Sequence, residues 1–234
     1  MSRIINPKID ALFVEGPDDG AVVNAFIEKR TGISLGSRPY LVRVHDVGGG
    51  GKWALREFEN YVAAAPEDAR VGVIIDRDGV DGRPDNWPSV SALLARLGAV
   101  SGSPLCTGHI VKGRFGIWMW PDNITVGGDL EDFVAGIVPP SPVLAFAGEA
   151  SRSAKDTHGA EYDAAHVRKA SLKVRSIWRD ASAAGGYGHL VRNLPLVETQ
   201  ASRAFHAWFT ELFVTSPAAP RAASASGGAP PGGP

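Results

Sequence analysis

The chain has 234 residues, of which 44% are hydrophobic, and a formal net charge of −1 at pH 7. This length and composition suit one sizeable domain with a real core, and the charge gives no overall field that would attract nucleic acid, so such a partner would need a local basic patch or a metal. The single cysteine, Cys106, excludes an intramolecular disulfide, and with no apolar leader or membrane-length apolar run we expect a cytoplasmic protein without a membrane partner.

The first half of the chain alternates strand-like and helix-like segments. Strands are predicted at residues 11–14, 40–47 and 71–75, each followed by a helix, and a pair of strands at 109–111 and 114–120 precedes a helix at 129–138. The apolar run at 71–75 is continuous, which is typical of a strand covered on both faces. This order predicts an α/β fold with a mostly parallel sheet flanked by helices.

The pattern becomes helical after the two prolines at 139 and 140. Apolar stripes at helical spacing predict helices over 166–180 and 205–213, and the segment from Ser216 consists mainly of Pro, Ala, Gly and Ser. We therefore predict an α/β core at 1–140, a helical extension packed on it at 141–214, and a disordered tail at 215–234.

Three carboxylates follow the predicted strands. Glu15 ends the first strand, and Asp76 and Asp78 end the third. A lone acid in such a place is usually a turn residue or a helix cap, and a D-x-D pattern alone is a weak signal. In an extended segment, however, residues two apart face the same side, and the carboxyl ends of parallel strands form a binding edge. Their joint placement therefore favours a site for a hard cation such as Mg²⁺.

The segments that carry these acids resemble the motifs of TOPRIM domains. Residues 14–19 (VEGPDD) are similar to the first motif, and residues 74–78 (IIDRD) to the second. The resemblance implies a Rossmann-like TOPRIM core at 1–140 in which Glu15, Asp76 and Asp78 are catalytic and bind Mg²⁺ or Mn²⁺ near a phosphodiester. Residues 116–123 and 130–133 extend it to stand-alone TOPRIM-like proteins related to the overcoming-lysogenization-defect nucleases.

A second acidic pair lies at the start of the helix predicted at 129–138. Asp132 and Asp129 fit a capping arrangement, whereas Glu131 has no such local role. The resemblance implies that Glu131, with Asp132, binds a second cation, and two cations would clamp the attacking and leaving oxygens of a phosphoryl displacement.

Four further residues are candidates for the pocket. Asp19 is assigned mainly to capping of the first helix, although it can face the same pocket. Asp122 and Asn123 either line the pocket or form an Asx turn after Pro121. Lys52 follows a glycine run that fails as a P-loop because Trp53 replaces Ser or Thr.

Basic residues cluster on the helix predicted at 166–180. Arg168 and Arg175 share one side and are candidates for phosphate binding, although a solvated helix face is the more common explanation of such a pattern. The resemblance implies a lysine that assists phosphate chemistry, for which Lys169 and Lys52 are the candidates.

The sequence therefore predicts a Mg²⁺-dependent nuclease or a related phosphodiester-processing protein that acts on nucleic acid. The alternative is a non-catalytic TOPRIM module that binds nucleic acid or a partner, alone or with a separate ATPase, and family analogy connects such modules with phage defence. A third hypothesis is hydrolysis or sensing of a nucleotide.

Overall fold

The protein is represented by a computed structural model that describes residues 10–35, 43–80, 82–100, 102–163, 166–179 and 186–215. The predicted disordered tail from residue 216 onward and the first three residues of the strand predicted at 40–47 lie outside these ranges. The strands are β1 (Ala11–Val14), β2 (Arg43–Asp46), β3 (Val71–Asp76), β4 (His109–Val111) and β5 (Phe115–Trp120). The helices are α1 (Pro17–Thr31), α2 (Gly51–Ala64), α3 (Trp87–Arg96), α4 (Leu130–Ile137), α5 (Pro142–His158), α6 (Val167–Arg179), α7 (Tyr187–Asn193), α8 (Gln200–Phe209) and the π-helical turn η2 (Thr210–Val214).

The five strands form one sheet in the order β2-β1-β3-β5-β4. Among the described strands all neighbouring pairs are parallel except β4 with β5, so the antiparallel strand β4 lies at the edge of the sheet. Val14 pairs with Ile74 and Asp76 with Trp120, which brings the carboxyl ends of β1, β3 and β5 to one edge. The predicted α/β fold with a mostly parallel sheet flanked by helices is confirmed.

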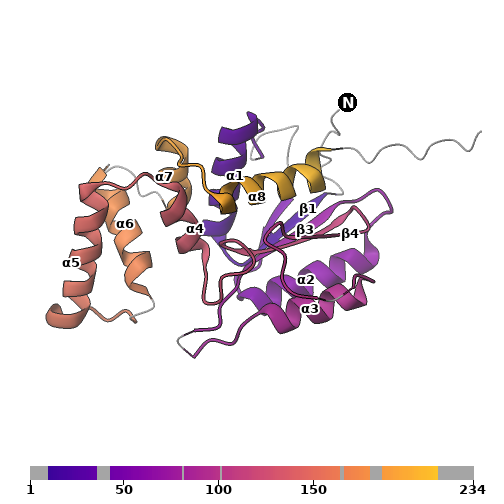
Figure 1. The fold of residues 1–234 in the computed structure, drawn as a ribbon, viewed down its shortest axis with the longest axis horizontal. Coiled ribbons are helices and arrows are strands. Elements are labelled where there is room, and N and C mark those ends of the chain that lie inside the picture. The colour runs from indigo at the N-terminus through magenta and orange to yellow at the C-terminus, as the bar shows by residue number, and fades with distance from the viewer. Residues whose placement is uncertain are drawn as a thin grey trace, which may run out of the picture.

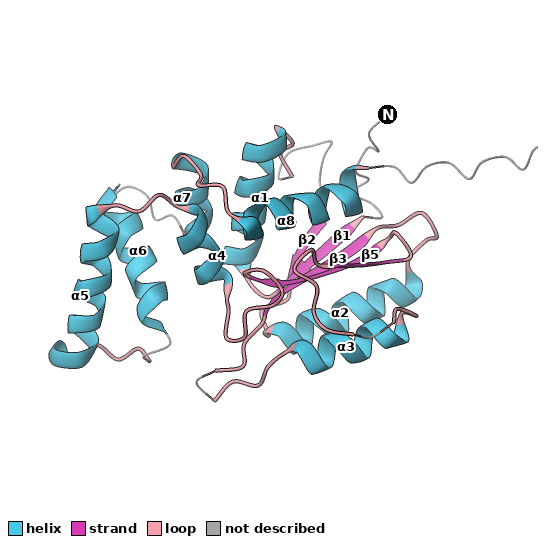
Figure 2. Ribbon diagram, viewed as in Figure 1, coloured by secondary structure: helices cyan, strands magenta, loops and turns pink. Residues whose placement is uncertain are grey.

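Helices cover both faces of the sheet. Figures 1 and 2 show α2 and α3 on one face, and α1, α4, α7 and α8 toward the other. Along β5 the side chains alternate between the two layers: Ile117 and Met119 pack with Phe58 of α2, while Trp118 and Trp120 pack in the opposite layer. The central strands are thus buried on both sides, as their continuous apolar sequence predicts.

The C-terminal helices belong to the same core as the sheet. Trp208 of α8 and Leu212 of η2 lie so close to β5 that a Cβ atom on Gly116 would stand 2.8 Å from Trp208 and 2.3 Å from Leu212. A Cβ atom on Gly72, the β3 partner of Gly116, would likewise stand 3.2 Å from Leu212. These two glycines therefore let the last helical segment lie directly on the sheet.

A hairpin of two helices, α5 and α6, projects from the side of the α4–α7 layer (Figure 1). Ser141 caps α5 through a hydrogen bond from the Leu144 backbone N–H to its hydroxyl, 3.2 Å. Leu172 of α6 joins the main hydrophobic cluster, so the start of α6 is held against α4 and α7. Within the described ranges, no helix is both long and apolar enough to cross a membrane.

Candidate functional site

A cavity of about 300 Å³ lies at the carboxyl ends of β1 and β3. Five acidic residues line it: Glu15 after β1, Asp18 and Asp19 in the first turn of α1, Asp76 at the end of β3, and Glu131 in the first turn of α4. Lys169 of α6 also lines it, and the loop before α2 borders it through Gly48 and Gly50. We call this space the acidic cavity.

Glu15 and Asp76 are fixed by backbone N–H groups. The Asp76 N–H donates to Glu15 Oε1 over 2.8 Å, and the Leu130 N–H donates to Asp76 Oδ1 over 2.9 Å. The second oxygen of each carboxylate makes no hydrogen bond within the described ranges. The Leu130 bond joins the end of β3 to the start of α4, a helix N-terminus, which suits a negative charge.

Burial and mutual repulsion favour the protonated, neutral form of these carboxylates. Burial raises the pKa of Glu15 to about 7, and the nearby charges of Asp19 and Asp78 add to the rise. Burial also raises the pKa of Asp76 well above its usual range, with further contributions from Glu15, Asp19 and Glu131 among others. The cavity therefore favours protons or a cation over a group of ionised carboxylates.

Asp19 both caps its helix and faces the acidic cavity. Its Oδ2 accepts a hydrogen bond from the Gly16 N–H, 3.2 Å, as the capping prediction requires. Its Oδ1 accepts a bond from the Trp120 indole N–H, 2.8 Å, which joins α1 to the end of β5. Burial raises the pKa of Asp19 to about 7, although the Trp120 bond opposes the rise.

Glu131 is buried and held by two partners from later in the chain. The Tyr187 hydroxyl donates to Glu131 Oε1 over 2.9 Å, and Lys169 Nζ lies 3.5 Å from the same oxygen. Burial and the charge of Glu131 raise the pKa of the Tyr187 hydroxyl. Tyr187 therefore stays a proton donor to Glu131, and the helices α6 and α7 complete a site that begins at the sheet.

Asp132 takes the capping role and does not line the acidic cavity. Its N–H donates to Asp129 Oδ1 over 2.9 Å, its Oδ2 accepts from the Asp129 N–H over 3.3 Å, and its other oxygen pairs with Arg168. Arg168, predicted to bind phosphate, is half exposed and also lies 3.8 Å from Asp129 Oδ1. Burial, with repulsion from Glu131, raises the pKa of Asp129 to about 6.

Asp78 does not point with Asp76 as the D-x-D pattern predicts. Its φ of 54° lies in the left-handed region, so the extended alternation ends before it. Asp78 Oδ1 lies 2.9 Å from Arg83 Nη1, and its Oδ2 accepts from Asn86 Nδ2 over 3.2 Å. The same Asn86 amide donates to the Asp76 carbonyl over 3.0 Å, so Asp78 stays near Asp76 without lining the acidic cavity.

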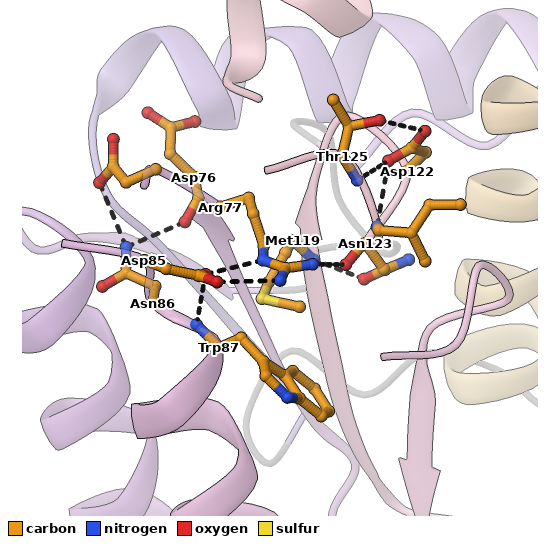
Figure 3. A network of polar contacts seen from close by, with 11 residues as sticks. Asp76, Arg77, Asp85, Asn86, Trp87, Met119, Asp122, Asn123 and Thr125 are labelled. Carbon is orange, nitrogen blue, oxygen red and sulfur yellow. Dashed lines mark hydrogen bonds and ion pairs between the residues drawn. The ribbon is translucent and has the colours of Figure 1, made fainter. Parts of the chain in front are cut away.

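Arg77, between the two aspartates, is a buried structural residue that the sequence analysis missed. Its Nε and Nη2 donate to the two oxygens of Asp85 over 2.7 and 2.9 Å, and its Nη1 donates to the Asn123 carbonyl over 2.8 Å (Figure 3). This fork ties the loop after β3 to the loop after β5. A charged residue enclosed by two acids is a usable sequence signal, but Asp85 and Asn123 lie too far along the chain to be identified as its partners.

The turn interpretation holds for Asp122 and Asn123. The carboxylate of Asp122 accepts bonds from the backbone N–H groups of Ile124 and Thr125 over 3.1 and 2.8 Å. Asn123 is buried, and its Oδ1 accepts from the Met119 N–H over 2.7 Å, as Figure 3 also shows. Neither residue lines the acidic cavity.

Two basic candidates lie elsewhere. Lys52 is exposed at the start of α2, where it borders a separate hollow between α2 and α3 with Arg56 and Arg96. Arg175 is buried, and its Nη2 donates to the Pro139 carbonyl over 3.0 Å, so it supports the α4–α5 connection and is not part of a surface patch. Of the two lysines that the sequence left open, only Lys169 reaches the acidic cavity.

The donor set of the acidic cavity suits a hard cation. Carboxylate oxygens are the ligands that Mg²⁺ and Mn²⁺ accept, and the free second oxygens of Glu15 and Asp76 are available for one. In the described part of the chain, no three His, Cys, Asp or Glu side chains already stand in an arrangement that could hold a metal ion.

A glycine that the sequence analysis treated only as part of a turn also belongs to this site. A Cβ atom on Gly51 would stand 2.8 Å from Glu15 Oε1 and 3.1 Å from Asn86 Nδ2. The absence of a side chain at the start of α2 therefore gives the Glu15 carboxylate its room. The glycine run itself was the available signal, because a run without P-loop spacing still indicates close approach of the backbone.

The comparisons with known proteins give a family and no functional assignment. Residues 9–214 match the family described as "Protein of unknown function (DUF3226)". No curated protein and no solved structure matches the chain. The matched segment runs from just before β1 to the end of η2 and therefore includes every element that builds the acidic cavity. The chain belongs to the DUF3226 family.

Proposed function

We propose that this protein is a Mg²⁺- or Mn²⁺-dependent nuclease, or a closely related phosphodiester-processing enzyme, whose active site is the acidic cavity. One observation carries the proposal: five acidic residues from four parts of the fold gather with a lysine in one cavity at the carboxyl ends of parallel strands. Structure alone would not need such a gathering, because like charges there raise one another's pKa. The resemblance of the Glu15 and Asp76 segments to TOPRIM motifs supports it.

The residues have separable roles. Glu15 and Asp76 would hold the cation through their free oxygens, and Asp19 and Glu131 would complete its oxygen shell directly or through water. When bound, the cation would polarise a phosphate and lower the pKa of a water molecule. Asp78, linked to Asp76 through Asn86, positions the end of β3.

Lys169 supplies the positive charge of the site. Its Nζ lies 3.5 Å from Glu131 and is half exposed, so a substrate phosphate can approach it from solvent. Tyr187 keeps Glu131 oriented, because its buried hydroxyl donates to the same carboxylate oxygen that Lys169 approaches. Lys169 would therefore stabilise negative charge on the phosphate as it is attacked.

The test compares Asp76→Asn with Asp156→Asn, an exposed aspartate on α5 that serves as the matched control. Calorimetric titration with Mg²⁺ and cleavage of labelled single-stranded and duplex DNA and RNA are measured for both. Asp76→Asn should lose Mg²⁺ binding and at least about a hundredfold of the cleavage rate, whereas the control should match the wild type. The Asn side chain can still accept the Leu130 N–H, so the fold should persist.

Cleavage by Asp76→Asn at the wild-type rate would reject the acidic cavity as the active site. Mg²⁺ binding by the wild type without cleavage of any of the four substrates would reject the nuclease and leave the binding module.

A further inference from the structure

A second cavity of about 540 Å³ lies beside the acidic cavity, between α4, α5, α6 and the loop after β3. Three arginines line it: Arg83 from that loop, Arg152 from α5 and Arg168 from α6. Its lining contains one carboxylate, Asp129. We call this cavity the arginine groove, and Figure 1 shows the helices α5 and α6 that form its outer wall.

The two cavities meet at the first turns of α4 and α6. Arg168 lines the groove and the next residue, Lys169, lines the acidic cavity, so their Cα atoms are about 3.8 Å apart. Asp129, the N-cap of α4, lines the groove, and Glu131 two residues later lines the acidic cavity. A ligand that fills the groove therefore ends next to the carboxylates.

Two of the three arginines of the groove form ion pairs, and Arg152 does not within the part of the chain that the structure describes. Arg83 and Arg168 are each held by carboxylates, through Asp78 at 2.9 Å and through Asp129 and Asp132, which fixes their guanidinium groups at the edge shared with the acidic cavity. The Arg152 side chain is exposed and has no hydrogen bond or ion pair with any described residue. Guanidinium groups match phosphate geometry, so Arg152 is the cation most available to an incoming anion.

The rest of the lining is apolar except for Ser171. Val80, which is 42% exposed, and the half-buried Leu144 and Val167 face the groove together with alanine and glycine. A single strand offers unstacked bases to such walls, whereas a duplex hides its base faces and presents only phosphates. The volume falls in the range of about 300–1,000 Å³ that holds one small organic ligand, and therefore admits a nucleotide unit.

We propose that the arginine groove binds the nucleotides adjacent to the scissile phosphate, so that the substrate is a single strand of nucleic acid. The phosphates lie on the arginines and a base packs on the apolar wall. This inference rests on the proposed function for the identity of the scissile phosphate, but strand binding by the groove can be measured without cleavage.

The test measures the binding of a fluorescein-labelled single strand of about 12 nucleotides by fluorescence anisotropy. EDTA is present so that nothing is cut. Wild type, Arg152→Ala, Arg152→Lys and Arg203→Ala are compared, where Arg203 is an exposed arginine of α8 outside both cavities. Arg152→Ala should weaken binding about tenfold and reduce the slope of log K against log salt by about 0.7, the value for one phosphate contact on a single strand. Arg152→Lys should recover most of the affinity, and Arg203→Ala should bind as the wild type does.

A duplex of the same sequence and a nucleoside monophosphate serve as competitors. Weak competition by both supports the inference. Wild-type affinity in Arg152→Ala, equal or tighter binding of the duplex, or displacement by the monophosphate at the concentration of the strand would each overturn it. Because Asp76→Asn should still bind the strand, loss of cleavage with intact, Arg152-dependent binding tests the groove separately from the chemistry. A wild type that binds through Arg152 but never cuts would sustain the groove and reject the nuclease.

Discussion

At the residue scale, the second aspartate and the arginine of the D-R-D segment form hydrogen bonds and ion pairs that hold the neighbouring loop. Asp78 has a left-handed backbone and its two oxygens contact Arg83 and Asn86, and Arg77 between the aspartates is buried with its fork on Asp85. Since Arg77 also reaches the Asn123 carbonyl, one side chain sets the relative position of two loops beside the acidic cavity. A lysine cannot reproduce this fork, because it carries a single point charge.

We expect Arg77→Lys to lower the free energy of unfolding by about 2–4 kcal/mol, because it leaves a partly buried carboxylate and a buried carbonyl without their partners. Arg96→Lys is the matched control, since Arg96 makes the same forked contact with Glu59 on an exposed surface, at 2.6 and 3.1 Å. It should cost at most about 1 kcal/mol. Urea unfolding measures both, and equal costs would show that the Arg77 fork does not hold the loops.

At the element scale, the start of α2 limits where the Glu15 carboxylate can stand. Helices end or begin around the acidic cavity at α1, α2, α4 and α6, so small changes at these termini move the ligands without disturbing the core. Gly51 leaves little room at its helix terminus, because the Glu15 carboxylate occupies the space that a side chain at Gly51 would take.

Gly51→Ala should change the free energy of unfolding by less than about 1 kcal/mol, because alanine favours the helix while only the ends of the Glu15 and Asn86 side chains must shift. It should nevertheless weaken Mg²⁺ binding by about 10- to 100-fold, since the displaced carboxylate is a proposed ligand. Gly136→Ala in α4 is the control: nothing lies within 4 Å of its added Cβ, so it should stabilise the helix by about 0.5–1 kcal/mol and leave Mg²⁺ binding unchanged. Calorimetric titration would contradict the proposed positioning if both variants bound Mg²⁺ equally well.

At the scale of the whole molecule, the ionised carboxylates of the acidic cavity lower the stability of the folded state, and a bound cation would offset this loss. The pKa values of Glu15 and Asp19 rise to about 7 in the folded protein, and that of Asp76 also rises. The folded state therefore holds more protons than the unfolded chain between about pH 4 and pH 7. The stability that these protons confer is present at the acidic end of this window. It is lost as the pH rises through the pKa values that the carboxylates have in the folded protein.

We therefore expect the melting temperature in EDTA to fall between pH 5 and pH 8, and Mg²⁺ to restore it most at pH 8, where the carboxylates are ionised. At a Mg²⁺ concentration of 100 times Kd the gain should be about 2.7 kcal/mol. The double variant Glu15→Gln with Asp76→Asn should show a smaller fall with pH and no gain from Mg²⁺. Thermal unfolding across this range would refute the interpretation if the wild type were insensitive to both pH and Mg²⁺.

The sequence by itself determined the features that depend on local periodicity and on strand order. Continuous apolar runs end at Glu15 and Asp76, so both acids could be placed at one edge of a parallel sheet before any coordinates were known. The Asp129–Asp132 capping pair could also be predicted from the sequence, because its hydrogen bonds join residues only three positions apart.

Only the tertiary structure decided which side chains join these acids. Asp19 is drawn into the acidic cavity by Trp120, 101 residues away, and Glu131 by Tyr187 and Lys169. Lys169 rather than Lys52 reaches the site because the α5–α6 hairpin folds back on α4, a long-range packing that no local pattern encodes. The D-x-D spacing could not show that Asp78 has a left-handed backbone and pairs with Arg83, because Arg83 lies outside the strand whose alternation the spacing describes.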